Sequence, residues 1–128
     1  MSNVPEALAA LEHEQWIAWS KSLAAAEPLS AERVERWRGL WVPYADLSEQ
    51  EKDADRVWAE KALAIVADPL ASALTLEYRE CCRRLADPAL QNPLWWLGYR
   101  CGIEDLVARL AEKGIAVTLP SPATRRDR

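Results

Sequence analysis

The single histidine of the chain, His13, lies in the segment HEQW with a glutamate on either side. A histidine beside carboxylates is a usual starting point for acid–base catalysis, because imidazole titrates near neutral pH. Catalysis also needs a surrounding site, and the sequence has no glycine-rich phosphate loop, no G-x-S-x-G segment and no H-E-x-x-H segment. We therefore predict that the protein is not an enzyme and that His13 is structural or contacts a partner.

Metal and thiol chemistry are also disfavoured by the pattern. Four carboxylates occupy alternate positions of one segment: Glu49, Glu51, Asp53 and Asp55. On a helix such positions point to different sides, so we expect a solvated helix start rather than a cation site. An odd number of cysteines, two of them adjacent, makes a poor disulfide framework. We expect buried free thiols at Cys81, Cys82 and Cys101, and we predict no metal and no cofactor.

Tryptophan is the residue in excess, with seven copies and no phenylalanine in 128 residues. Trp16, Trp37 and Trp58 lie on apolar stripes, where core packing is the plain interpretation. The adjacent pair Trp95 and Trp96 cannot both face inward on one helix, so one of them should lie at a surface, an interface or a pocket. On the same helix, Gly98 and Gly102 permit close helix packing, either within the chain or between two copies.

Composition limits the classes of function. A chain of 128 residues, half of them apolar, has the size of one domain. A formal charge of -4 argues against sequence-independent nucleic-acid binding, which requires clustered Lys and Arg. No segment approaches the ~20 apolar residues of a membrane span, and MSNVPEAL lacks the features of a signal peptide. We expect a cytoplasmic protein without nucleic-acid or membrane partners.

The elements that position these residues are predicted to be helices. Apolar spacing and end signals predict five of them, over residues 5–26, 30–39, 48–67, 69–85 and 94–113. Ser30 is a good N-cap, Ser48 and Glu51 form a capping box, and Gly114 is a natural C-cap. Three short junctions, each an Asp or Asn followed by proline, separate helices: Asp68-Pro69, Asp87-Pro88 and Asn92-Pro93.

Each helix has a predicted inward face. In the first helix it comprises Leu8, Leu11, Trp16, Trp19 and Leu23, with His13 toward the opposite side. The stripe of the third helix comprises Ala54, Val57, Trp58, Ala62, Ile65 and Val66. The fourth helix presents Leu70, Leu74, Tyr78 and Leu85, and the fifth presents Leu106, Val107 and Leu110.

The predicted fold is therefore mainly α, a compact bundle of about five helices with short Asp-Pro or Asn-Pro junctions. After Gly114, residues 115–119 are expected to form a short strand or an extended arm packed on the bundle. We predict one domain over residues 1–119, with helical halves at 8–66 and 69–119. Residues 120–128 are expected to be a disordered tail.

Three motifs in the first half carry a family resemblance. HEQW at residues 13–16, VPYADL at 42–47 and EKDADR at 51–56, in that order, resemble the RyR domain, the small repeat of ryanodine receptors that also occurs in bacterial and phage proteins. The resemblance covers residues 8–66, and the half at 69–119 has no assigned family. It implies a compact, helical, non-catalytic module that binds partners or ligands, adenine nucleotide among them.

Carried over by residue, the resemblance implies ligand contacts at Trp16, Tyr44, Lys52 and Arg56. Aromatic faces would stack on a base, and Lys or Arg would meet a phosphate. The alternative interpretation is structural, because Tyr44 and Arg56 could instead pin the intervening loop onto two helices.

Two functions follow as predictions. The first is a small, non-enzymatic binding module, oligomeric and of phage or bacterial accessory type, that engages a nucleotide-like ligand and could sequester a signal. The second is a protein–protein interaction inhibitor or accessory factor, for example against a host defence complex. It would use the acidic helix start and an interface at Trp95, Trp96, Gly98 and Gly102, with a homodimer as one form of that contact.

Overall fold

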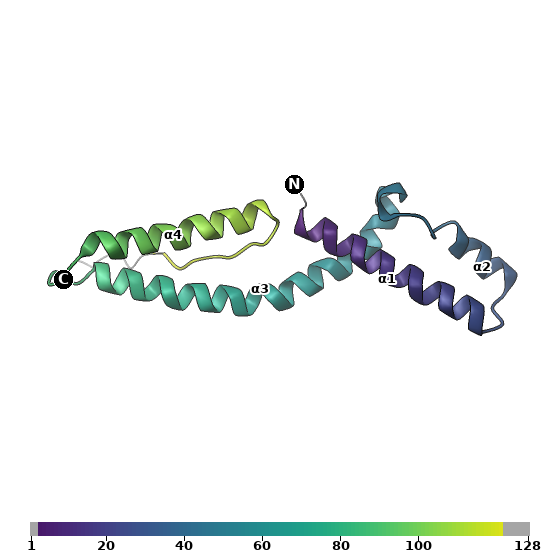
Figure 1. Ribbon diagram of the computed structural model, residues 1–128, viewed down its shortest axis with the longest axis horizontal. Coiled ribbons are helices and arrows are strands. Elements are labelled where there is room, and N and C mark those ends of the chain that lie inside the picture. The colour runs from purple at the N-terminus through teal and green to yellow at the C-terminus, as the bar shows by residue number, and fades with distance from the viewer. Residues whose placement is uncertain (1–2, 122–128) are drawn as a thin grey trace. The chain divides into compact units, whose positions relative to one another are not determined.

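The computed structural model describes residues 3–121, and within that range it contains helices and no strand. The elements are α1 (Val4–Ala26), α2 (Ala31–Arg38), the short 3-10 helix η1 (Tyr44–Asp46), α3 (Glu49–Leu85) and α4 (Pro93–Glu112), as Figure 1 shows. The mainly α prediction is confirmed. Most of the predicted tail, from residue 122 on, lies outside the described residues.

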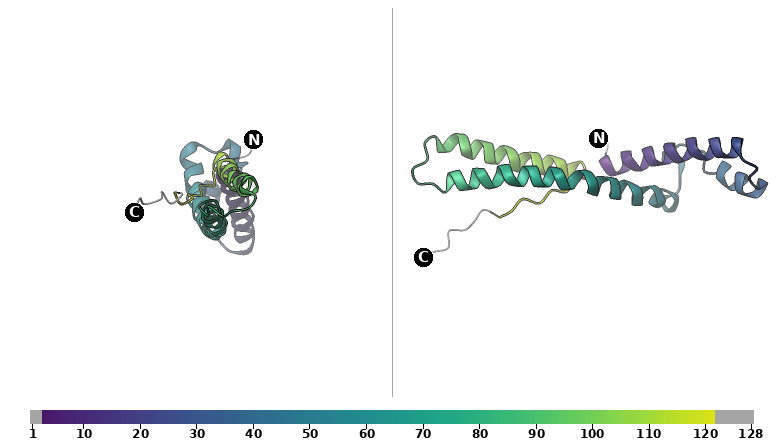
Figure 2. Two further views of the ribbon diagram at one scale, coloured as in Figure 1. Left: turned by 90° about the vertical axis from the view of Figure 1, so that its left-hand side faces the viewer. Right: turned by 90° about the horizontal axis from the view of Figure 1, so that it is seen from below.

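Two compact units divide the chain, with unit 1 ending at Leu63 and unit 2 beginning at Ala64. In unit 1, α1 contacts η1 and the first part of α3. In unit 2, α4 runs antiparallel beside the second part of α3, and the two helices lie side by side in every view (Figures 1 and 2). The single domain predicted for residues 1–119 stays a prediction.

The helix ends follow the predicted signals. Ser30 caps α2, its Oγ accepting from the amide of Arg33 at 3.2 Å. The Ser48 and Glu51 capping box forms in both directions, with the Ser48 amide donating to Glu51 Oε2 at 2.8 Å and the Glu51 amide donating to Ser48 Oγ at 3.3 Å. Local sequence therefore sets where α2 and α3 begin.

One predicted junction is wrong. Asp68-Pro69 does not end a helix, since α3 continues from Glu49 to Leu85 with Pro69 inside it. A proline within a helix leaves the carbonyl four residues earlier without its amide donor. Here that carbonyl belongs to Ile65, a residue that is 76% exposed. The Asp87 and Asn92 junctions do separate helices, and the Asp87 carboxylate accepts from the amide of Ala89 at 2.9 Å.

The chain after α4 is the predicted extended arm rather than a strand. Gly114 has a φ of 83°, and the amides of Gly114 and Ile115 donate back to the carbonyls of Ala111 and Leu110 at 2.9 Å each. This pair of bonds is the Schellman motif, which favours glycine at the left-handed position. Beyond it Val117 is buried, and Leu119 packs against the core of unit 2.

The inward face predicted for α1 is wrong in part, since Leu8, Trp16 and Leu23 are half-buried but His13 lies inside. Leu11 and Trp19 are more than half exposed, whereas the buried residues of this helix are Ala9, His13 and Ser20. The reason is polar bonding across the unit: Ser20 Oγ accepts from Trp41 Nε1 at 2.9 Å, and both ring nitrogens of His13 have partners. The buried side chains of α1 are therefore small or hydrogen-bonded, and they are not its largest apolar ones.

The stripe predicted for residues 48–67, now within α3, is also wrong, because most of its large residues are exposed: Val57 (49%), Trp58 (59%), Ile65 (76%) and Val66 (61%). Ala59 is the fully buried residue of this stretch. On α1 and on this stretch of α3 alike, the fully buried apolar residue is an alanine, Ala9 on α1 and Ala59 on α3.

Unit 2 has a buried core that matches the predicted faces in part, because Tyr78 and Leu74 belong to it as predicted and Ile103 lies outside the predicted face of its helix. Tyr78, Cys81 and Ile103 form a buried cluster, and the partly buried residues packed on it are Leu74, Cys82, Trp96 and Leu119. Within α4 the prediction for Leu106 is wrong, since that side chain is 44% exposed. Ile103 takes the inward position, one turn earlier on the helix.

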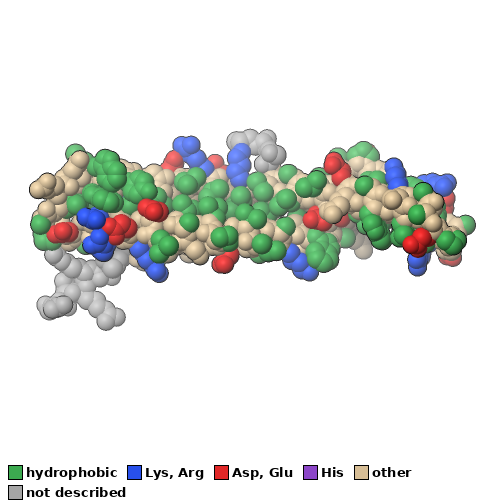
Figure 3. Space-filling view, turned by 60° about the horizontal axis from the view of Figure 1, so that its bottom comes forward, with side chains coloured by type: hydrophobic (Ala, Val, Ile, Leu, Met, Phe, Trp, Pro, Cys, Tyr) green, Lys and Arg blue, Asp and Glu red, His purple; other side chains and the backbone are tan. Residues whose placement is uncertain are grey.

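The three thiols differ in burial. Cys81 is buried and Cys82 is partly buried, but Cys101 is exposed, which corrects the expectation that all three are buried. Hydrophobic side chains reach the surface over much of the face drawn in Figure 3. Even so, none of the helices described is long and apolar enough to cross a membrane.

Candidate functional site

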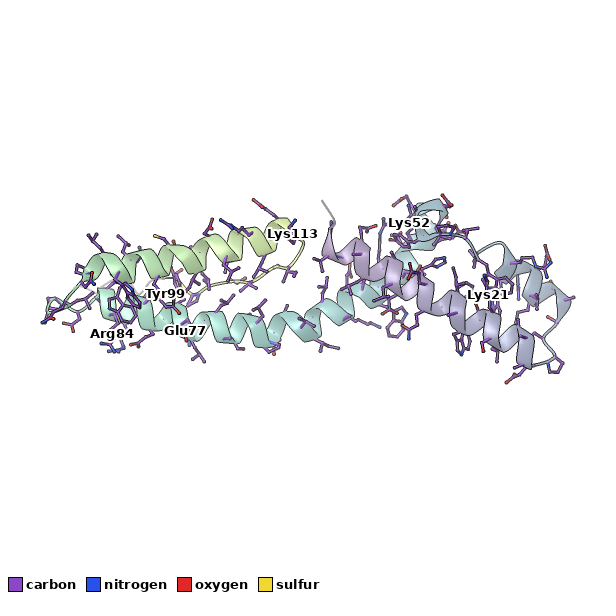
Figure 4. The ribbon with its side chains drawn as sticks, viewed as in Figure 1. Lys21, Lys52, Glu77, Arg84, Tyr99 and Lys113 are labelled. Carbon is purple, nitrogen blue, oxygen red and sulfur yellow. The ribbon has the colours of Figure 1, made fainter. Side chains whose placement is uncertain are left out.

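Three of the four residues implied as ligand contacts meet in unit 1, around a glutamate of α1. Tyr44 of η1 donates to Glu6 Oε2 at 3.0 Å, and Arg56 of α3 donates to the same carboxylate through Nε at 2.7 Å. Lys52 Nζ, labelled in Figure 4, lies 5.5 Å from the centre of the Tyr44 ring and 3.3 Å from Glu49 Oε1. Glu6 therefore joins three elements of the unit.

The cationic groups of this cluster already have anionic partners. Arg56 pairs with three carboxylates, those of Glu6, Glu49 and Asp53, at 2.7–2.9 Å. These bonds raise the pKa of Arg56 above its usual value, and the bond from Arg56 is the largest influence that lowers the pKa of Glu6. Such contacts fit the structural interpretation of Tyr44 and Arg56, which pin η1 between α1 and α3.

Trp16, the fourth implied contact, belongs to an aromatic cluster instead. Its ring stacks on His13 at 6.0 Å between centroids and meets Trp37 edge-on at 6.0 Å. Trp19 belongs to the same cluster, because its ring centroid lies 6.0 Å from that of Trp37. The cluster holds α2 against α1 and leaves part of the Trp16 indole accessible.

His13 is the polar centre of the same region. Its Nε2 lies 2.9 Å from the carbonyl oxygen of Val42, which can only accept, so Nε2 carries a proton. Its Nδ1 lies 3.3 Å from Asp55 Oδ2. Burial raises the pKa of Asp55, against the opposing influence of His13. His13 thus connects the segment before η1, through Val42, to α3, through Asp55.

A pocket of about 470 Å³ opens beside this pair, entirely within unit 1. Its lining comes from α1, from the connecting segments and from α3: Glu12, His13, Trp16, Leu40, Leu47, Glu51, Ala54, Asp55 and Trp58. A shallower hollow of about 270 Å³ adjoins it and shares Glu12 and Trp16. Two indoles therefore border a largely apolar space of the size that small ligands occupy.

The charge of this pocket is negative. Three carboxylates and no Lys or Arg side chain line it. Asp55 is held by His13, and Glu51 accepts from Ser48, which lowers the pKa of Glu51. Glu12, by contrast, makes no hydrogen bond or ion pair with any residue in the described range, and it borders both hollows.

This arrangement does not favour acid–base catalysis by His13. Both ring nitrogens of His13 lie beside protein oxygens, Nε2 at Val42 O and Nδ1 at Asp55 Oδ2, so neither is directed at a substrate. The lining also supplies no hydroxyl, thiol or amine side chain as a nucleophile. In the described part of the chain, no group of three His, Cys, Asp or Glu could hold a metal ion.

The residues predicted as an interface lie on α4 of unit 2, and they divide between two sides. Trp96 packs inward on the core cluster beneath Arg84, whereas Trp95 is 56% exposed and stacks on Tyr99 at 5.5 Å. One tryptophan of the pair is thus at the surface, as predicted. A Cβ added at Gly98 or Gly102 would meet no atom within 4 Å, so no helix of the described chain packs closely there.

Sequence reasoning missed the partners of these residues rather than the residues themselves. Glu6 and Asp55 lie 50 and 42 positions from Arg56 and His13 by chain number, and nothing local marks those pairings. Glu12 was passed over as one acidic neighbour of His13. The available signal was the helical spacing of Glu12 and Trp16, which places a carboxylate one turn from an indole.

Comparison with family models, curated proteins and solved structures finds no match for this chain. The resemblance to the RyR domain therefore rests on the three motifs, and it stays a prediction.

Proposed function

We propose that this chain is a non-enzymatic binding module of the cytoplasm, and that the pocket of unit 1 holds a small organic ligand with a positively charged group. The observation that supports this most is the pairing of two indoles, Trp16 and Trp58, with three carboxylates in a lining that has no Lys or Arg. Indole faces attract ammonium groups, and carboxylates fix their position.

An internal contact illustrates the attraction. Lys61, which is outside the lining, places its ammonium 4.2 Å from the centre of the Trp58 ring. The indole of Trp58 therefore already takes a cation on one of its faces. A ligand ammonium inside the pocket would meet Trp16, the Glu12 carboxylate and the apolar side chain of Leu40 together.

The nucleotide-like ligand implied by the resemblance fits this pocket less well. Glu12, Glu51 and Asp55 would repel a phosphate, and Arg56 is bonded to three carboxylates away from the lining. A nucleotide could still place its base against an indole, so nucleotides belong in the test as competitors of the cation.

The proposal is tested by tryptophan fluorescence and thermal shift with matched ligands. Choline is compared with 3,3-dimethylbutan-1-ol, which has the same shape without the charge, and with AMP. We expect choline to quench fluorescence and raise the melting temperature, the neutral alcohol to bind more weakly by about tenfold, and AMP to leave the affinity for choline unchanged. Displacement of choline by AMP would instead support the nucleotide-binding prediction.

Glu12→Gln is the diagnostic variant, because Glu12 has no hydrogen bond or ion pair to lose among the described residues. It should weaken choline binding by about fivefold or more while leaving stability unchanged. Glu14→Gln is the matched control, since Glu14 is exposed on the same helix outside the lining and carries the same charge. Equal losses in both variants would contradict a role for the pocket.

A second candidate function is a protein contact through α4. The exposed Trp95 and the open surface at Gly98 and Gly102 favour it, because a helix from a partner could approach that side closely. A homodimer is the simplest such contact. Sedimentation equilibrium of the wild type and of Gly98→Leu tests it: a dimer that dissociates in the variant supports the contact, and a monomer in both excludes self-association.

A further inference from the structure

A second pocket, of about 640 Å³, lies in unit 2 and has the opposite charge. Its lining joins the end of α3, one residue of α4 and the chain after the arm: Tyr78, Arg79, Cys82, Arg83, Leu85, Ala86, Arg100, Pro120 and Ser121. Three arginines line this space, and no Asp or Glu side chain does. Arg83 and Arg100 each have a glutamate nearby, Glu80 and Glu104, but the pocket itself presents guanidinium groups and no carboxylate to a ligand.

Arg100 has a donor that the protein does not use. Its Nε is buried and has no hydrogen-bond partner in the described chain. Glu104 Oε1 forms an ion pair with it at 3.6 Å, which is too far for a hydrogen bond, and that oxygen already accepts from the Tyr78 hydroxyl at 2.9 Å. A buried N–H without an acceptor costs free energy, so an acceptor supplied by a ligand would be favoured there.

The other two arginines differ in how far they are engaged. Arg79 is exposed and makes no hydrogen bond or ion pair with a described residue. Arg83 is held by Glu80 through two bonds, Nε at 2.8 Å and Nη2 at 2.6 Å. Glu80 therefore fixes the Arg83 guanidinium at the edge of the pocket. Arg79 and Arg100, in contrast, have N–H donors without a hydrogen-bond partner among the described residues.

We infer that the pocket of unit 2 is an anion site, in which Arg79 and Arg100 bind a phosphate group. Phosphate oxygens accept several charge-assisted hydrogen bonds at once, and planar guanidinium groups donate them in pairs. The hydroxyl of Ser121, also in the lining, adds a neutral donor at the same place. This site is separate from the pocket of unit 1, and it stands whether or not unit 1 binds a cation.

The probe is pyrophosphate, titrated at constant ionic strength with sodium chloride as the balancing salt. The readouts are the melting temperature and the side-chain Nε–Hε resonances of arginine in a nitrogen–proton correlation spectrum. We expect pyrophosphate to raise the melting temperature and to shift the Arg100 resonance most, because that N–H gains an acceptor. Inorganic phosphate and AMP should compete for the site, which identifies the phosphate group as the shared determinant.

Two variants and a control complete the test. Arg100→Gln and Arg79→Gln should each weaken pyrophosphate binding by about tenfold, and Arg79→Gln keeps the test valid if the half-buried Arg100 variant fails to fold. Arg109→Gln removes the same charge from unit 2 at an exposed position outside the lining, and it should bind pyrophosphate like the wild type. Equal binding by all three variants, or equal stabilisation by chloride alone, would overturn the inference.

Discussion

Glu6 accepts hydrogen bonds from both Tyr44 and Arg56, so its charge should govern how unit 1 responds to acid. The bond from Arg56 chiefly lowers the pKa of Glu6 below its usual 4.5. A lowered pKa in the folded state gives stability that is present above pH 4.5 and is lost as the pH falls through the folded value.

Glu6→Gln is therefore expected to lower the melting temperature by roughly a few degrees at pH 7 and to make stability less sensitive to pH below 4.5. Melting curves between neutral and acid pH measure this. Glu14→Gln, at an exposed site on α1, should keep the acid sensitivity of the wild type. An unchanged pH profile in Glu6→Gln would show that other carboxylates carry the acid response.

Residue types were easier to predict than residue partners. Tyr44, Lys52 and Arg56 do meet in unit 1, with Trp16 in a separate aromatic cluster, but the resemblance could not reveal that Glu6 occupies the donors of Arg56. Such pairs depend on how α1 crosses α3, which no local pattern encodes. The same holds for His13, whose burial follows from acceptors at Val42 and Asp55.

At the scale of elements, Pro69 gives a direct test of the continuous α3. Replacing a proline inside a helix by alanine restores an amide donor and removes a steric conflict, so Pro69→Ala should stabilise the protein by about 1–3 kcal/mol. Urea denaturation measures the difference. Pro88→Ala, in the turn between α3 and α4, should change stability little. If Pro69→Ala is neutral or destabilising, a helix break at Asp68-Pro69, as the sequence suggested, is the better description.

The glycines of α4 and its end should respond in opposite directions. Gly102 lies within the helix with open space around it, so Gly102→Ala should stabilise by up to about 1 kcal/mol. Gly114 has a φ of 83°, and alanine there should destabilise by about 1–2 kcal/mol. Thermal unfolding compares the two variants. A destabilising Gly102→Ala would mean that this face is covered, as in the dimer considered above.

Element ends were predictable because caps are local. Ser30, the Ser48 and Glu51 box and Gly114 act over at most five residues, and all are where their motifs predict. Inward faces were less predictable, because hydrophobic spacing assumes that the largest apolar residues face the core. In unit 1 the buried residues of α1 are instead alanine, serine and histidine, and Leu11 and Trp19 lie outside.

At the scale of the whole molecule, each unit combines residues that are distant in sequence, and the pockets arise from that combination. The acidic pocket needs Glu12 and Trp58, and the basic pocket needs Arg79 and Arg100. The overall charge of -4 predicts neither, since it averages over regions of opposite sign. Helical class follows from composition and spacing, but the location of binding sites follows only from how the helices pack.

Ile103 allows a test of whether the two units unfold independently. Ile103 is 6% exposed and packs with Tyr78 and Cys81, both in unit 2. Ile103→Ala should therefore destabilise unit 2 by about 2–4 kcal/mol through lost burial and a residual cavity. Amide hydrogen exchange should accelerate in α4 and in the second part of α3, while amides of α1 keep their protection, because the lost contacts lie within unit 2. Equal acceleration in both units would instead mean that residues 1–119 unfold as the single cooperative domain predicted from the sequence, with α3 as the element that couples its halves.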